Sequence, residues 1–195
     1  MRAVLLILFA CTLFVGCTKE NPNIPALKTA LQESLEISES TKAFPADSII
    51  SVRERMNKAK DDVRWLGIEA SVEFVRTDAP IIGKLSEASR FLKDAPSRLS
   101  GLKKESERCM SQISGLISII ETNATNDANG DTINDAYINE NAARELEAVE
   151  SLKRTYTDTE RFFRLGLEID SVHWSSIDSL ITAKRGEYSR NIAGE

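Results

Sequence analysis

Apolar residues recur at alternating steps of three and four along much of the chain, which is the spacing of one face of an α-helix. These positions form three long seams, whereas β-branched residues do not alternate with polar ones over any useful length. We therefore predict an all-α fold, an antiparallel helical bundle with coiled-coil-like hairpin packing. The seams are Ile49, Val52, Met56, Ala59, Val63, Leu66 and Ala70; Leu99, Leu102, Ser106, Cys109, Ile113, Leu116 and Ile120; and Ala142, Leu146, Val149, Tyr156, Phe163, Leu167, Trp174, Ile177 and Ile181.

The first two seams each cover about 25 residues, or roughly 37 Å of helix at ~1.5 Å per residue. Because their lengths match, we expect these two helices to pack against each other as antiparallel partners. Asp47 is the expected N-cap of the first helix. A loop and a shorter helix are predicted over 73–94, a further helix over 26 to about 40, and a long turn over 123–131.

The helix of the third seam would exceed about 70 Å if it were continuous, so we expect a bend near Gly166 rather than a straight rod. Lys153, Glu160 and Asp170 interrupt its apolar face. These interruptions suggest that the helix is not fully buried within the bundle. Its apolar face is therefore the expected surface for a partner.

The first residues follow a different pattern. Arg2 precedes an apolar run over 3–15, and the chain turns polar at Thr18. One basic residue followed by about a dozen apolar residues is the layout of a secretory signal. The run is too short to span a bilayer comfortably, which takes roughly 20 apolar residues.

The end of this run, Leu13-Phe14-Val15-Gly16-Cys17, resembles the lipobox of bacterial lipoproteins. The resemblance implies that the peptide is cut between Gly16 and Cys17, and that Cys17 carries acyl chains that anchor the protein to a membrane. Phe14 departs from the leucine that is usual in the family. Cys11 fits a lipobox more loosely, because it would leave a very short apolar core. The alternative is an ordinary secretory signal with an incidental cysteine.

This interpretation divides the chain into three parts: a signal peptide at 1–16, a lipidated cysteine with a short tether at 17–25, and a helical bundle domain at 26–190. The protein is expected in the bacterial cell envelope, on the periplasmic face of a membrane or at the cell surface. Acyl chains on one cysteine hold a protein firmly, because each buried methylene contributes roughly 0.8 kcal/mol.

Charge and residue counts restrict the function further. The chain has 30 acidic residues and 25 basic ones, of which Arg2 lies in the predicted signal, so the mature net charge is 24 − 30 = −6. A general nucleic-acid binder needs a basic surface and is not expected. With a single histidine, His173, and a single cysteine outside the N-terminal segment, Cys109, a Cys/His zinc site is excluded.

The candidate chemistry is weak. Asp170 and His173 lie one helical turn apart, but no nucleophile accompanies them. The segment from Asp127 to Asp131 lacks the glycine and glutamate of a calcium loop and is interpreted as a polar turn. Cys109 lies on an apolar seam and is expected to be buried. We predict no enzymatic activity, no cofactor and no metal.

The sequence thus predicts a membrane-anchored, non-enzymatic interaction or structural protein, which binds an envelope protein through an apolar helix face. The alternative is a lipoprotein that binds a small ligand in a pocket between helices. The expected contact residues for either partner or ligand are Trp65, Phe162, Asp170, His173 and Trp174.

Overall fold

The computed structural model describes residues 21–127 and 129–194. In these ranges the fold is all-α, as predicted, and it forms a packed helical bundle. The elements are α1 (Ile24–Lys42), α2 (Ala46–Ile68), the 3₁₀-helix η1 (Arg76–Asp78), α3 (Ala79–Leu92), α4 (Ala95–Thr122) and α5 (Asp135–Ala193). The predicted signal peptide and lipobox, including Gly16 and Cys17, lie outside the described residues. None of the helices in the described ranges is long and apolar enough to cross a membrane.

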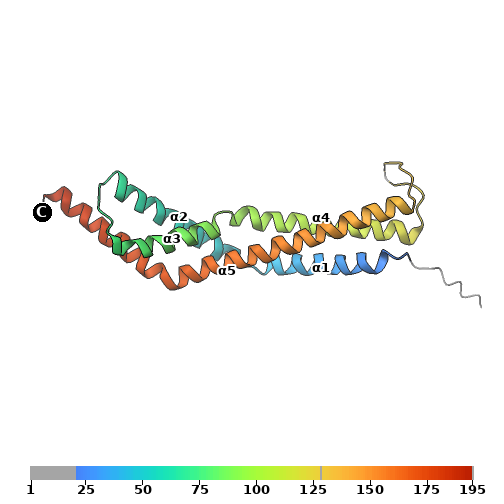
Figure 1. Cartoon of the computed structure of the whole chain (residues 1–195), viewed down its shortest axis with the longest axis horizontal. Helices are drawn as coiled ribbons and strands as arrows, with labels where there is room; N and C mark the ends of the chain where they lie inside the picture. Colours follow the sequence, from blue (N-terminus) through green and yellow to red (C-terminus); the bar gives the residue numbers. More distant parts are fainter. Residues whose placement is uncertain (1–20, 128, 195) are drawn as a thin grey trace, which may run out of the picture.

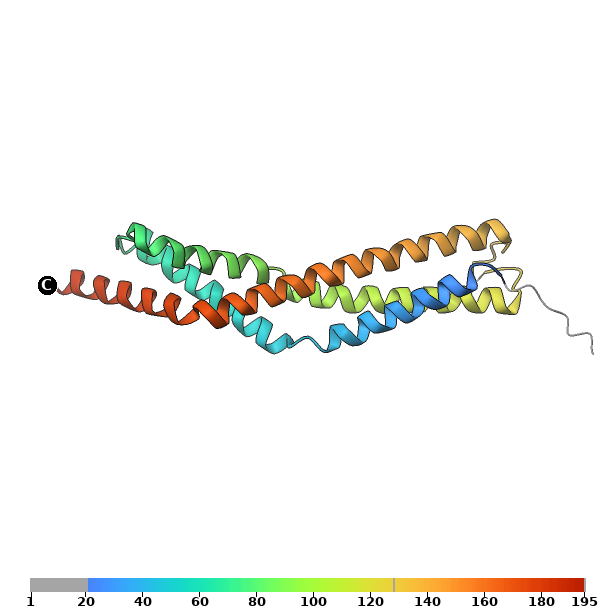
Figure 2. The same ribbon diagram turned by 60° about the horizontal axis from the view of Figure 1, so that its bottom comes forward.

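The helices form two three-helix lobes placed end to end (Figure 1). The proximal lobe consists of α1, α4 and the first half of α5, and it contains Asn21, the first described residue. The distal lobe consists of α2, α3 and the second half of α5. Each lobe has its own apolar core. Figure 2 shows the same elongated arrangement after a turn of 60°, with α5 extending through both lobes.

Phe44 joins the two cores where α1 turns into α2. Its side chain packs against both cores, with its ring 5.6 Å from that of Tyr156 and 5.3 Å from that of Phe163. Pro45 follows directly and ends the helical path, because proline lacks an N–H and disfavours helix in the residue before it. The chain therefore changes lobes at an aromatic contact with the middle of α5.

Local sequence signals set most helix ends. A proline lies in the first turn of α1, α3 and α4, where its missing N–H costs no helical hydrogen bond. Asn134 caps α5 by accepting a hydrogen bond from the backbone N–H of Tyr137. The prediction that Asp47 is the N-cap of its helix was wrong, because α2 begins at Ala46 and Asp47 lies in its first turn. A carboxylate at that position still interacts favourably with the helix dipole.

The predicted pairing of the first two seams was also wrong. The first seam lies on α2 in the distal core, except for Ala70, which follows the end of α2. The second seam lies on α4, and most of it belongs to the proximal core. The main antiparallel neighbour of α4 is α1, and that of α2 is α3. Equal length does not make α2 and α4 partners, because α5 is long enough for the two helices to pack against different halves of its 59 residues.

The last helix is one continuous element, and it bends rather than forming a straight rod, as predicted. The helix α5 covers 59 residues, or about 88 Å of helix at ~1.5 Å per residue, and it changes direction in its C-terminal half (Figure 1). Gly166 also permits close packing: a Cβ added there would lie 2.5 Å from both Cγ and Cδ2 of Leu92 on α3. Leu92 itself is fully buried.

We expect Gly166→Ala to destabilise the protein by about 1–3 kcal/mol, because the added methyl group overlaps Leu92 in a closed core. Gly101→Ala on α4 is the matched control, since nothing lies within 4 Å of its added Cβ. That substitution should stabilise the protein by roughly 0.5–1 kcal/mol through helix propensity alone. Urea unfolding followed by circular dichroism measures both. Equal effects of the two substitutions would contradict the close-packing role.

Candidate functional site

The five residues predicted as ligand or partner contacts all lie in or beside the distal lobe, but they do not form one site. Asp170 and Trp174 belong to a contact with α2. Arg55 donates from Nη2 to both carboxylate oxygens of Asp170, and its guanidinium lies 4.5 Å from the ring centroid of Trp174. Asp170 is buried and Trp174 half-buried. This arrangement ties α2 to α5 and leaves the Asp170 carboxylate committed to Arg55.

His173 does not join that contact. It is half-buried on α5. The nearby Glu87 of α3 has a lowered pKa, chiefly because Lys84 donates a hydrogen bond to its carboxylate. Among the described residues His173 belongs to no ion pair, whereas Asp170 is paired with Arg55 of α2. The two residues do not line the cavities described below. The geometry offers no relay of carboxylate, imidazole and nucleophile.

Trp65 lies near the free end of the distal lobe. Its ring meets that of Tyr188 edge to face, with centroids 5.0 Å apart, and it remains 40% exposed. Ile68 follows one turn later on α2 and is 73% exposed. Ile192 follows Tyr188 by one turn on α5 and is also exposed. Because α2 and α5 run in the same direction here, both pairs progress toward the end farthest from Asn21 (Figure 1).

The exposed large apolar side chains are unevenly distributed between the lobes. Of the six among the described residues, five lie in the distal lobe and only Leu35 lies in the proximal lobe. Scattered single residues of this kind need no explanation, but their concentration in one half marks that half as the better candidate for partner contact. The five are Trp65, Ile68, Val75, Val172 and Ile192, which we call the distal apolar set.

A buried lysine holds the loop that carries Val75. Lys184 of α5 donates to the carbonyl oxygen of Glu73 at 2.7 Å and lies 3.5 Å from a carboxylate oxygen of Asp78. Its burial lowers the pKa, but its hydrogen bond and charge interactions with Glu187 and Asp78 outweigh this and raise the pKa overall. Lys184 is thus held charged, and it fixes the connection between α2 and α3.

Phe162 lines a recess at the junction of the lobes. Its ring stacks on that of Phe91 with centroids 5.8 Å apart. The recess has a volume of about 270 Å³, and its other lining residues are Arg90, Asp94 and Arg98. Phe162 is therefore the one predicted contact residue that lines a described cavity. Sequence reasoning missed Phe91 and the arginines, because only the packing of α3 and α4 on α5 brings them together.

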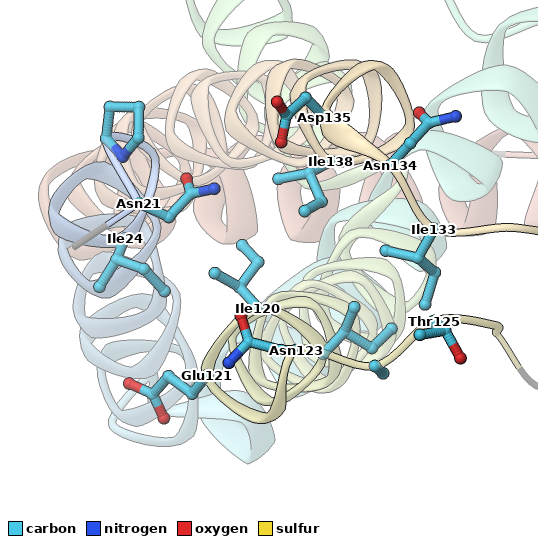
Figure 3. Close-up of a pocket in the computed structure, with 13 residues that line it drawn as sticks. Asn21, Ile24, Ile120, Glu121, Asn123, Thr125, Ile133, Asn134, Asp135 and Ile138 are labelled. Carbon is cyan, nitrogen blue, oxygen red and sulfur yellow. The ribbon is translucent and has the colours of Figure 1, made fainter. Parts of the chain in front are cut away.

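A larger hollow lies at the open end of the proximal lobe, with a volume of about 980 Å³. Figure 3 shows Ile24, Ile120 and Ile138 pointing into it from α1, α4 and α5. Asn21 and Asn123 lie at its rim. Two carboxylates, Glu121 and Asp135, also line the hollow, but no histidine, cysteine, lysine or arginine accompanies them among the described residues that line it. The hollow lies where the chain enters the described structure.

Cys109 is fully buried in the proximal core, as predicted. Burial raises the pKa of its thiol, and the neighbouring Arg108 only partly opposes this effect. Arg108 pairs with the buried carboxylate of Glu145 at 3.2 Å, so α4 and α5 are linked beside the thiol. A thiol that is both buried and hard to ionise is structural rather than reactive.

The turn before α5 is polar, as predicted. The carboxylate of Asp127 accepts hydrogen bonds from the backbone N–H groups of Asn129 and Asp131 and from the hydroxyl of Tyr137. These hydrogen bonds, led by that of Asp131, lower the pKa of Asp127. Within residues 21–127 and 129–194, no three His, Cys, Asp or Glu side chains come together as metal ligands.

No family model, curated protein or solved structure matches this chain.

The contact between Arg55 and Asp170 generates a stability prediction. Arg55→Met should cost about 2–3 kcal/mol, somewhat less than the ~3–5 kcal/mol for breaking a fully buried pair, because the Arg55 side chain is 38% exposed. Arg64→Met is the control on the same helix, since Arg64 is 71% exposed in a weak pair with Asp61. It should change the free energy of unfolding by less than about 0.5 kcal/mol. Equal costs for the two variants in urea unfolding would refute the structural role of Arg55.

Proposed function

We propose that this protein is a membrane-anchored, non-enzymatic interaction protein of the bacterial cell envelope, which presents a protein-binding surface on its distal lobe. The anchor is expected at Cys17, from the resemblance of residues 13–17 to a lipobox. Cys17 precedes Asn21 by four residues, which reach at most about 14 Å when extended. An anchor at that position keeps the open end of the proximal lobe next to the membrane.

The observation that carries the proposal is the uneven exposure of apolar side chains. The distal apolar set belongs to the lobe farther from the predicted anchor, and Trp65, Ile68 and Ile192 lie toward its free end. A helix of about 88 Å holds this surface at a distance from the membrane. The protein would then act as a spacer, with attachment at one end and recognition at the other.

The arrangement of polar groups favours binding over catalysis. Asp170 is engaged by Arg55 and Trp174, and Cys109 is buried in the proximal core. The small-ligand alternative has less support, because Trp65 and Trp174 line none of the cavities described and the recess at Phe162 is small. The hollow of about 980 Å³ in the proximal lobe is large enough for a ligand, but none of the five predicted contact residues lines it. Sites for drug-sized ligands usually measure ~300–1,000 Å³.

The anchor is tested by metabolic labelling with an alkyne-bearing fatty acid. Wild-type protein should take up the label and sediment with membranes, because two or three acyl chains hold a protein far more strongly than one. Cys17→Ala should abolish both, whereas Cys11→Ala should retain both. Labelling that survives Cys17→Ala and is lost in Cys11→Ala would place the anchor at Cys11. Absence of the label from the wild-type protein would refute the lipoprotein interpretation.

The distal surface is tested by photo-cross-linking in intact cells. A photoreactive phenylalanine analogue at Ile68 should capture one specific envelope protein, because this side chain is the most exposed of the distal apolar set. The same analogue at Thr155, an exposed position in the proximal half of α5, is the matched control and should capture that protein far less.

Trp65→Glu, introduced into the chain with the analogue at Ile68, should reduce the amount of cross-linked product at least about tenfold. The reason is that binding of the partner would bury a carboxylate in place of an aromatic side chain. The product should also depend on Cys17. Identical products from positions 68 and 155, or a product indifferent to Trp65→Glu, would count against partner binding by the distal lobe.

A further inference from the structure

The recess at Phe162 combines aromatic surface with positive charge. Phe91 and Phe162 stack with an interplanar angle of 23°. The guanidinium of Arg98 lies 4.8 Å from the ring centroid of Phe162, and that of Arg90 lies 5.4 Å from the ring centroid of Phe91. Arg161 also lies over Phe162, at 5.3 Å. Three guanidinium groups thus surround one stacked pair of rings.

The two arginines that line the recess have unused hydrogen-bonding capacity. Among the described residues, neither Arg90 nor Arg98 belongs to an ion pair. Arg98 makes one long hydrogen bond, 3.4 Å from Nη1 to the hydroxyl of Thr159. A guanidinium carries five N–H donors in a planar fork that matches a carboxylate. This concentration of cations stands out in a chain with net charge −5.

The recess is held in place by the core behind it. Leu92, which follows Phe91, packs against Gly166, and Phe163, which follows Phe162, packs against Phe44. Leu92 and Phe163 are both buried. Because each ring of the recess is adjacent in sequence to a core residue, the two rings lose little conformational entropy when a ligand binds.

We propose that this recess binds an acidic segment of a protein partner. An apolar or aromatic side chain of that segment packs on Phe91 and Phe162, and a neighbouring carboxylate accepts hydrogen bonds from Arg90 and Arg98. Asp94 also lines the recess and opposes the anion, so it limits the affinity. The inference rests on the proposed function only in taking a protein as the ligand, and it requires neither the anchor nor the distal apolar set.

The size of the recess favours a side chain over a free small molecule. Its volume of about 270 Å³ is below the usual range for drug-sized ligands, ~300–1,000 Å³, and five residues line it. A free molecule would bury little surface there. A side chain of a partner needs only such a recess, because the rest of the interface supplies the remaining contacts.

The test uses the full chain in detergent and three probes followed by NMR titration. The first is an N-acetylated, C-amidated Glu-Phe-Glu peptide, the second is the uncharged Gln-Phe-Gln peptide, and the third is phenylacetate. We expect the acidic peptide to bind about tenfold more tightly than its uncharged counterpart, and less tightly as the salt concentration rises.

Variants locate the binding. Arg98→Gln and Arg90→Gln should each weaken the acidic peptide about fivefold to tenfold, with no change for the uncharged one. Asp94→Asn should strengthen binding about twofold to threefold by removing an opposing charge. Arg164→Gln is the matched control, since it makes the same change in charge at an exposed position of α5. Circular dichroism checks that each variant is folded. If Arg98→Gln is not folded, Arg90→Gln alone carries the test, because Arg90 is exposed and its substitution leaves the core intact.

Selective binding of the acidic peptide that follows the two arginines and not Arg164 supports the proposal. Equal binding of both peptides, or equal effects of Arg98→Gln and Arg164→Gln, overturns it. Phenylacetate binding as tightly as the acidic peptide overturns it in favour of a small anionic ligand. These readouts do not depend on Cys17, so failure of the anchor and failure of the recess are distinguishable.

Discussion

The continuous helix α5 is the element on which the rest of the structure depends, and its close approach to α3 at Gly166 is the contact that closes the distal core. Each lobe has only two other helices, and two helices cannot enclose a core by themselves. The proximal lobe therefore uses the first half of α5 and the distal lobe the second half. At Gly166 the absence of a side chain lets Leu92 pack directly onto the helix, which brings α3 close enough for this lobe to close.

Buried charge follows the same logic. The three buried charged residues among those described, Glu145, Asp170 and Lys184, all belong to α5. Each is met by a partner from a different part of the fold: Arg108 of α4, Arg55 of α2, and the loop before η1. An unpaired charge at any of these positions would be costly, so each pair favours one register of α5 against its neighbours over a slipped one. The shared helix is thus located along its length by ionic contacts as well as by apolar packing.

This arrangement gives the two ends of the molecule different properties. The proximal lobe begins beside the predicted anchor and ends in a hollow with an isoleucine floor (Figure 3). The distal lobe carries most of the exposed apolar side chains, and the junction between the lobes carries the recess of arginine and phenylalanine. A spacer with recognition surfaces away from its attachment is the function that this asymmetry favours, and the two surfaces differ in chemistry, one apolar and one cationic.

The sequence by itself determined the helical fold, the approximate helix boundaries and the buried seams, because helical spacing, first-turn prolines and polar turns act over a few residues. It also predicted that Cys109 is buried and that 123–131 forms a turn. Only the tertiary structure decided which helices pair and what the polar residues on α5 do. In the sequence, Asp170 interrupts an apolar face, and this interruption predicted a helix that is not fully buried. The structure buries Asp170, because Arg55, 115 residues away in sequence, pairs with its carboxylate. Partners that are far apart along the chain leave no local periodicity, and for the same physical reason the recess formed by Phe91, Arg98 and Phe162 could not be predicted from the chain alone.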